Sequence, residues 1–143
     1  MLKFAVCDDN IIILNRLTKM LESIFLKNNL CAEVVLSSNS SKELINYVNS
    51  NTLDVLILDI DFKSECSGLE LAKKIREKNK DMYLIFSTGH LEYALIAYKL
   101  KTFDYLPKPV TPERLEETVN RIFDDIKLEK ESNFINIGNS KVL

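Results

Sequence analysis

Five polar side chains with complementary chemistry follow short apolar runs in this sequence. Three are the carboxylates of Asp8, Asp9 and Asp59, one is the hydroxyl of Thr88 and one is the ammonium of Lys108. If the apolar runs are parallel strands, their carboxyl ends meet at one edge of a sheet, where open α/β sheets bind ligands. Carboxylates within a few ångströms of one another cannot all stay ionised at neutral pH without compensation. Mg²⁺ is a suitable cation, because it takes one or two carboxylates and completes its shell with water and phosphate oxygens.

Such a set of groups is suited to phosphoryl transfer onto Asp59. A carboxylate can attack phosphorus as a nucleophile and form an acyl phosphate. The ammonium of Lys108 is a point charge suited to a phosphate oxygen, and Thr88 offers a hydroxyl donor. With the cation, these groups would neutralise the charge that develops in the transition state. The sequence therefore predicts a phosphoacceptor aspartate at the centre of the site.

Each of these residues also has a structural explanation when taken alone. Two acids at a helix start commonly act as an N-cap, Thr88 could be a turn residue, and Lys108 could be a loop lysine before Pro109. A cap needs only one residue, so the Asp8-Asp9 pair leaves one acid unexplained. The position of the whole set at strand ends, in this order, favours a shared function.

The elements that must position these groups can be read from the apolar periodicity. The central run, Leu53–Asp59, is typical of a strand that is covered on both faces. Four further strands are predicted at Leu2–Cys7, Cys31–Leu36, Met82–Phe86 and Phe103–Leu106. Helical patterns separate them, at about 10–26, 42–48, 69–75, 91–100 and from 112 onward. This alternation predicts an α/β fold with a doubly wound, five-stranded parallel sheet and helices on both faces.

Composition limits the class of protein. The 143 residues, 46% of them hydrophobic, suit about one domain with a well-covered core. The net charge of −2 argues against a nucleic-acid-binding surface on this part of the chain. Cys7, Cys31 and Cys66 are widely spaced, which argues against a zinc site or a disulfide framework. With neither a signal peptide nor an apolar run of membrane length, we expect a cytoplasmic protein without a membrane partner.

The C-terminal residues break the alternation. Residues 127–133 are predicted to be the solvated end of the last helix. Phe134–Ile137 then alternates apolar and polar residues, and Gly138-Asn139 is a turn signal, so a strand is predicted there. Because a lone hairpin is marginal, we interpret this segment as the start of a second domain that is cut off at Leu143.

The order of the motifs resembles the receiver domain (CheY-like) of bacterial two-component response regulators. The resemblance covers about residues 1–128 and rests on Asp8-Asp9, Asp59, Thr88 and Phe103–Pro109. It implies a flavodoxin-like sheet with strand order 2-1-3-4-5. It also implies that Asp59 is the phosphoacceptor and that Mg²⁺ is bound by Asp9 and Asp59, by Asp8 through water, and by the backbone carbonyl of Asp61.

The resemblance further implies a switch. Thr88 and Tyr105 would be the switch pair, Lys108 would contact the phosphoryl group, and the bond between Lys108 and Pro109 would be cis. Phosphorylation would change the face formed by the fourth helix, fifth strand and fifth helix, which would then build a homodimer. The phosphoryl donor would be a sensor histidine kinase. The chain would thus be a phosphoacceptor and not an enzyme, and any turnover would be autodephosphorylation, tuned by Asp61 and His90.

A narrower resemblance concerns the output. His90–Ala94 and Phe103–Leu106 look like receivers that precede a LytTR DNA-binding domain, and the segment 134–138 is similar to that domain's opening strand. Residues 129–143 would be a linker and the truncated start of this domain, with DNA bound only through its missing part in transcription regulation. The loop from Asp59 to Gly68 lacks the usual proline and is longer than the commonest form, as in the accessory-gene-regulator branch.

Two alternatives remain open. A haloacid-dehalogenase-type phosphatase also uses an aspartyl nucleophile in an Asp-x-Asp context, which Asp59-Ile60-Asp61 fits locally. In those enzymes, however, that motif comes near the N-terminus and the acid pair near the end, the reverse of the order here. The other alternative is a stand-alone receiver that acts by docking to proteins, and the segment after Asn133 argues against it.

Overall fold

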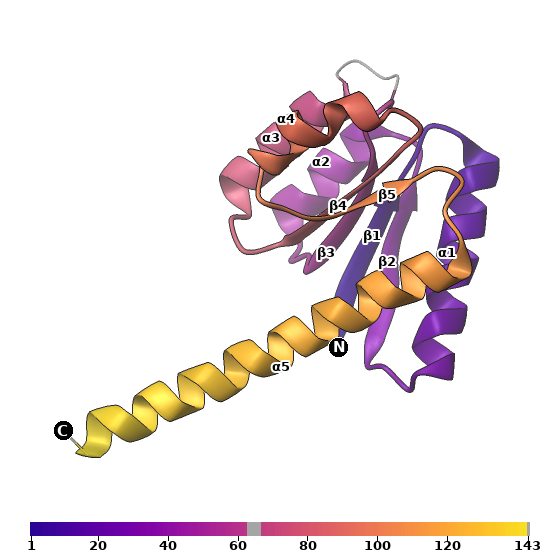
Figure 1. Cartoon of the computed structure of the whole chain (residues 1–143). Coiled ribbons are helices and arrows are strands. Elements are labelled where there is room, and N and C mark those ends of the chain that lie inside the picture. Colours follow the sequence, from indigo (N-terminus) through magenta and orange to yellow (C-terminus); the bar gives the residue numbers. More distant parts are fainter. Residues whose placement is uncertain (63–66, 143) are drawn as a thin grey trace.

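The computed structural model describes residues 1–62 and 67–142, and the side chains of these except Leu91 and residues 133–142. Strands and helices alternate as the apolar periodicity predicted (Figure 1). In chain order they are β1 Leu2–Cys7, α1 Ile11–Lys27, β2 Ala32–Ser38, α2 Ser41–Ser50, β3 Val55–Asp59, α3 Gly68–Lys78, β4 Tyr83–Thr88, the 3₁₀ turn η1 Leu91–Tyr93, α4 Ala94–Tyr98, β5 Thr102–Pro107 and α5 Pro112–Val142.

The five strands form one parallel sheet in the order β2-β1-β3-β4-β5, which confirms the predicted fold. The register aligns the carboxyl ends of the strands. Cys7 of β1 pairs with Leu58 of β3, Asp59 with Ser87 of β4, and Thr88 with Pro107 of β5. The residues that follow or end β1, β3, β4 and β5 therefore share one edge of the sheet.

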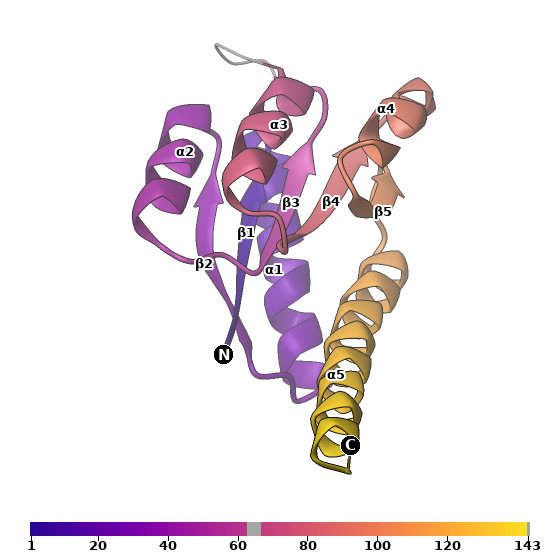
Figure 2. The same cartoon turned by 90° about the vertical axis from the view of Figure 1, so that its left-hand side faces the viewer.

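Helices cover both faces of the sheet, as two separate apolar clusters show. One cluster joins α2, α3 and α4 to one face through Leu44, Leu71 and Ala97, and the other joins α1 and α5 to the opposite face through Leu17 and Val119. Figure 2 shows α2 and α3 in front of the sheet and α1 behind it. All five β3 residues are buried, because this strand is covered on both sides.

Local sequence explains where the helices begin. The side chain of Asn10 accepts hydrogen bonds from the N–H groups of Ile12 and Ile13 at 3.0 and 3.2 Å, so Asn10 is the N-cap of α1. Neither Asp8 nor Asp9 is needed as that cap. The Thr111 side chain accepts from the Arg114 N–H at 3.2 Å and so caps α5, directly before Pro112 at the first position of the helix.

Helix α5 differs from the prediction at its C-terminal end. The predicted strand at 134–137 and the turn at Gly138-Asn139 are wrong for this chain, because the helix continues to Val142. A strand needs a neighbour for its N–H and C=O groups, whereas a helix satisfies them within the segment. Figure 1 shows the yellow end of α5 extending away from the sheet, and no strand of the described residues lies beside it.

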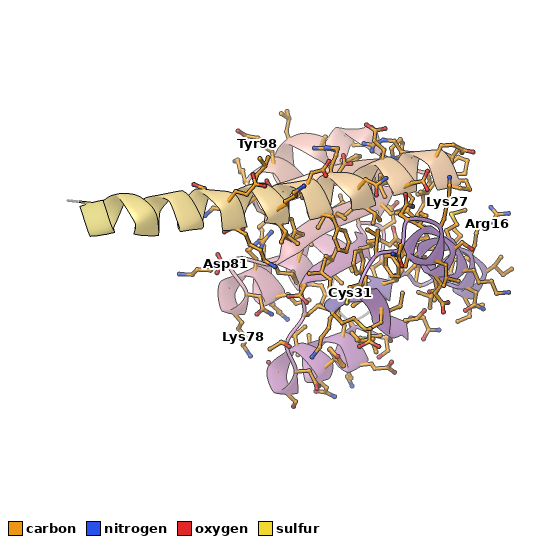
Figure 3. All side chains as sticks on the ribbon, turned by 90° about the horizontal axis from the view of Figure 1, so that it is seen from below. Arg16, Lys27, Cys31, Lys78, Asp81 and Tyr98 are labelled. Carbon is orange, nitrogen blue, oxygen red and sulfur yellow. The ribbon has the colours of Figure 1, made fainter. Side chains whose placement is uncertain are left out.

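The opposite edge of the sheet, seen in Figure 3, carries Cys31 and Asp81 ahead of β2 and β4. Cys31 is exposed, Cys7 is buried beside the core, and both are free thiols. Cys66 lies outside the described residues, as do the other positions of the 63–66 segment in the long loop. Within the described part of the chain, no helix has the length and apolar character needed to cross a bilayer.

Candidate functional site

The three predicted acids meet at the carboxyl edge of the sheet. Asp8 and Asp9 follow β1, Asp59 ends β3, and one carboxylate oxygen of each lies within 4.8 Å of the other two. Asp8 and Asp59 are buried, at 1% and 2% relative exposure, whereas Asp9 is exposed. Two buried carboxylates side by side are unfavourable unless positive charge is brought to them.

Lys108 supplies part of that charge. Its Nζ lies 3.0 Å from Asp8 Oδ2 and 3.3 Å from Asp59 Oδ1. The backbone N–H of Lys108 donates to the carbonyl of Thr88 at 2.8 Å, which fixes the start of the lysine side chain next to β4. The following bond to Pro109 is cis, as the resemblance implied. Burial alone would lower the pKa of Lys108, but the Asp8 and Asp59 carboxylates raise it above its ordinary value.

One ammonium does not balance the site. Burial and the neighbouring Asp8 carboxylate raise the pKa of Asp59 from 3.8 to about 6, although Lys108 and the Asp61 N–H act in the opposite direction. That N–H donates to Asp59 Oδ1 at 2.9 Å. Asp8 Oδ2 is buried and receives no hydrogen bond of acceptable geometry from the described residues, despite its contact with Lys108. The negative charge of the buried carboxylates is therefore only partly compensated, and a further cation would be stabilised at this site.

The residues fit Mg²⁺ by their chemistry. The grouped ligand atoms are all carboxylate oxygens, the donors that this hard cation prefers, and the Asp8 carboxylate carries a buried oxygen, Oδ2, that lacks a hydrogen bond from the described residues. Asp8, Asp9 and Asp59 could hold the ion, with water and the substrate completing its shell. Cys7, which precedes this cluster, is not among these grouped ligand atoms, and burial raises the pKa of its thiol to about 12.

The predicted switch residues lie at the same edge but are bonded away from Asp59. The buried Thr88 hydroxyl donates to Asp61 Oδ2 at 3.0 Å, and the His90 N–H donates to that hydroxyl at 3.0 Å. The hydroxyl of Tyr105 donates to the carbonyl of His90. His90 Nε2 lies 3.6 Å from Asp61 Oδ1, so Asp61, Thr88, His90 and Tyr105 form one connected group.

Gly68, at the start of α3, belongs to the site, although no motif in the sequence singled it out. A Cβ on Gly68 would lie 2.2 Å from the carbonyl oxygen of Asp59 and 2.7 Å from that of Ile60. Glycine is thus required because α3 begins directly against the backbone that carries the phosphoacceptor candidate. Only the three-dimensional approach of α3 to β3 reveals this.

We expect Gly68→Ala to lower the free energy of unfolding by about 2–3 kcal/mol, because the methyl group must displace the Asp59 and Ile60 backbone. Gly89→Ala is the matched control, since a Cβ there would meet nothing within 4 Å. Urea denaturation of both variants measures the effect. Equal stability of the two variants would contradict the close approach of α3 to Asp59.

Two arginines hold the surrounding elements and were also missed. Arg76 of α3 donates five hydrogen bonds to carbonyls between Asn79 and Lys101, which tie the α3–β4 and α4–β5 connections together. Arg114 of α5 makes two hydrogen bonds to Asp104 of β5, at 2.7 and 2.9 Å. Burial alone would raise the pKa of Asp104, but Arg114 and Thr118 hold it below its ordinary value. The acceptors of the Arg76 hydrogen bonds are backbone carbonyls, which every residue has. No sequence motif therefore identifies Arg76.

Comparison with known proteins places this geometry in a family. The family described as the response regulator receiver domain matches residues 4–120. A curated relative, the sensory transduction protein LytR of Staphylococcus haemolyticus, is 31% identical over 134 residues, which are 94% of this chain and 50% of that protein. The transcriptional regulatory protein LytR of Staphylococcus aureus is 31% identical over 85% of this chain and 47% of its own length. The chain thus spans about half the length of these relatives.

Solved structures agree with this match. A receiver domain protein from Clostridium thermocellum has a TM-score of 0.75 at 32% identity, covering 90% of this chain and 98% of that one. The receiver domain of AraT, a response regulator from Geobacillus stearothermophilus, has a TM-score of 0.77 at 30% identity, with the same coverage of 90% and 98%. Both structures match almost over their full length, so the likeness concerns the whole sheet and its helices.

Proposed function

This chain belongs to the response regulator receiver domain family, and from that premise we propose that it accepts a phosphoryl group on Asp59 in a Mg²⁺-dependent reaction. The observation that carries the proposal is the meeting of Asp8, Asp9 and Asp59 with Lys108, whose Nζ is 3.3 Å from Asp59 Oδ1. The proposed donor is the phosphohistidine of a sensor histidine kinase. The chain would be a phosphorylated switch and not an enzyme with a separate substrate.

In the proposed reaction, a carboxylate oxygen of Asp59 attacks the phosphorus, a P–O bond forms, and the P–N bond to the donor histidine breaks. Asp8, Asp9, Asp59 and the backbone carbonyl of Asp61 would hold Mg²⁺, which supplies positive charge to the transferring oxygens. Lys108 contacts Asp59 Oδ1 and can follow the new phosphoryl oxygens as a second positive charge. The hydrogen bond from the Asp61 N–H to Asp59 Oδ1 orients the nucleophile.

The proposed response to phosphorylation runs through Thr88 and Tyr105. The phosphoryl group adds about −1.5 to −2 charges and three acceptor oxygens, and the Thr88 hydroxyl would turn to donate to one of them. Tyr105 would then turn inward, and the face of α4, β5 and α5 would change. Exposed apolar side chains on α4 support a role for this face in homodimer formation, with Leu95 83%, Tyr98 81% and Ile96 43% exposed.

For the whole protein, we propose a C-terminal DNA-binding domain of the LytTR type that the receiver controls. The support is the identity to LytR proteins, of which this chain spans about half. Residues 1–128 would be the receiver and residues 129–143 the connection to that domain and its first residues. Asp61 and His90, two residues after Asp59 and Thr88, are proposed to tune the phosphoryl lifetime.

The test is incubation of the chain with acetyl phosphate and Mg²⁺, followed by intact-mass measurement. We expect a mass gain of one phosphoryl group that EDTA prevents and that hydroxylamine removes, as it does from acyl phosphates. No mass gain would refute the proposal. Steady release of phosphate from small phosphomonoesters, many times per minute, would instead favour a phosphatase.

Lys108→Ala should bind Mg²⁺ on the order of 10-fold more tightly than the unchanged chain, because it removes a positive charge that lies 3.0 Å from Asp8 and 3.3 Å from Asp59. Calorimetric titration well above the pKa of Asp59 measures this. Lys74→Ala, an exposed lysine of α3, is the control and should leave the affinity unchanged. Weaker binding in Lys108→Ala would place the cation elsewhere.

A further inference from the structure

The carboxylate of Asp61 has a contact that the phosphoacceptor reaction does not use. Asp61 Oδ2 accepts the hydrogen bond from the Thr88 hydroxyl at 3.0 Å, and Thr88 is fully buried at 0% exposure. The other oxygen, Oδ1, lies 3.6 Å from His90 Nε2. The Asp61 side chain itself is 27% exposed, so it reaches inward from the rim of the site.

A threonine hydroxyl has one proton and can make only one strong donation at a time. In this structure that proton is given to Asp61. The hydroxyl oxygen also accepts the His90 N–H at 3.0 Å, which further fixes its orientation. A hydrogen bond to a carboxylate is stronger than one to a neutral acceptor, and a buried hydroxyl that loses its acceptor pays the full cost of desolvation. Thr88 therefore leaves Asp61 rarely unless a stronger acceptor replaces it.

We propose that Asp61 is a positioning residue that latches Thr88 in the resting arrangement and so sets how rarely the unphosphorylated protein switches. This inference rests on the proposed function, since it concerns the same switch. It differs from an effect on phosphoryl lifetime, because the latch acts before any phosphoryl group is present. The phosphoryl oxygens on Asp59 release the latch by competing with Asp61 for a single proton.

The latch reaches Tyr105 through His90. The Tyr105 hydroxyl donates to the His90 carbonyl, while the N–H of the same residue donates to Thr88. Movement of Thr88 away from Asp61 therefore disturbs the residue that holds Tyr105 in its present rotamer. The two side chains also interact directly: burial raises the pKa of the Tyr105 hydroxyl, and a side-chain hydrogen bond with Thr88 acts in the opposite direction. A change at Thr88 would therefore reach Tyr105 both through residue 90 and through this side-chain contact.

The test uses Asp61→Ala and amide chemical shifts of residues 88–90 and 105 without phosphodonor or Mg²⁺. Loss of one charge-assisted hydrogen bond should raise the active-to-resting ratio about 10-fold. If about 1% of the unchanged protein is in the active state, about a tenth of the variant should be in that state. Its amide signals should then move about a tenth of the way toward the positions found with Mg²⁺ and beryllofluoride. Asp61→Asn, which keeps an oxygen acceptor, should move them less.

Glu92→Ala is the matched control. Glu92 Oε1 lies 3.3 Å from His90 Nδ1, so this variant also removes one negative charge beside His90 but leaves the Thr88 hydroxyl bond intact. Its signals should stay at the resting positions. Asp61→Ala signals that stay there too, or that move off the line joining the two states, would overturn the latch. Absence of any beryllofluoride response in the unchanged protein would instead count against the proposed function.

Discussion

Asp59→Asn is expected to take up no phosphoryl group from acetyl phosphate under conditions that fully modify the unchanged chain. The amide is not a nucleophile toward phosphorus, and no other described carboxylate has both the Lys108 contact and the Asp61 N–H donor on the same oxygen. Intact-mass measurement over a time course gives the result directly.

The control for this loss is Asp124→Asn, which changes an exposed aspartate of α5 in the same way. It should be modified at the rate of the unchanged chain. Both variants should retain the cooperative unfolding of the domain, so that a negative result for Asp59→Asn reflects chemistry and not misfolding. Full phosphorylation of Asp59→Asn would show that another group is the acceptor.

Asp59→Asn should also be more stable than the metal-free unchanged chain at neutral pH. The folded-state pKa of Asp59 is about 6 against an ordinary value of 3.8, so the folded state holds its proton more tightly than the unfolded state. Stability from this group is therefore fully present below pH 3.8 and is lost as the pH rises through 6. Above that pH the asparagine variant should gain about 2–3 kcal/mol over the unchanged chain.

Urea unfolding in EDTA across this pH range measures the difference between the two proteins. The contributions of distant titratable groups cancel in this difference, whereas those of Asp8 and Lys108 remain because these groups interact with Asp59. The difference should vanish at the acid end and grow toward neutral pH. Saturating Mg²⁺ should stabilise the unchanged chain much more than the variant, because the ion compensates the buried Asp8 and Asp59 charges. A difference that does not depend on pH would contradict the electrostatic explanation of the site.

The sheet and the acid cluster could be predicted because a parallel sheet brings strand ends to one edge. The site residues stand directly after apolar runs or at their ends: Asp8, Asp59, Thr88 and Lys108. Asn10 is the N-cap of α1, so both Asp8 and Asp9 remain available for the site. The sequence suggested this, because it has two acids where a cap needs only one residue. The strand at 134–137 was wrong because alternation alone does not supply a pairing partner.

What could not be predicted depends on contacts between distant parts of the chain. The closeness of Gly68 to the Asp59 carbonyl follows from how α3 packs on β3, and the five hydrogen bonds of Arg76 go to main-chain atoms. The bond from Thr88 to Asp61 was likewise invisible, since spacing shows that two groups share an edge but not which oxygen takes the proton. Such details need side-chain geometry.

The most direct measurement is the location of the phosphoryl group. After reaction with acetyl phosphate and Mg²⁺, borohydride reduces an acyl phosphate to an alcohol and so marks the modified aspartate as homoserine for peptide mass mapping. The site geometry predicts the mark at Asp59 alone, with Asp8, Asp9 and Asp61 unmarked. A mark on one of those three residues, or on none of the four, would contradict the assignment of Asp59 as the phosphoacceptor.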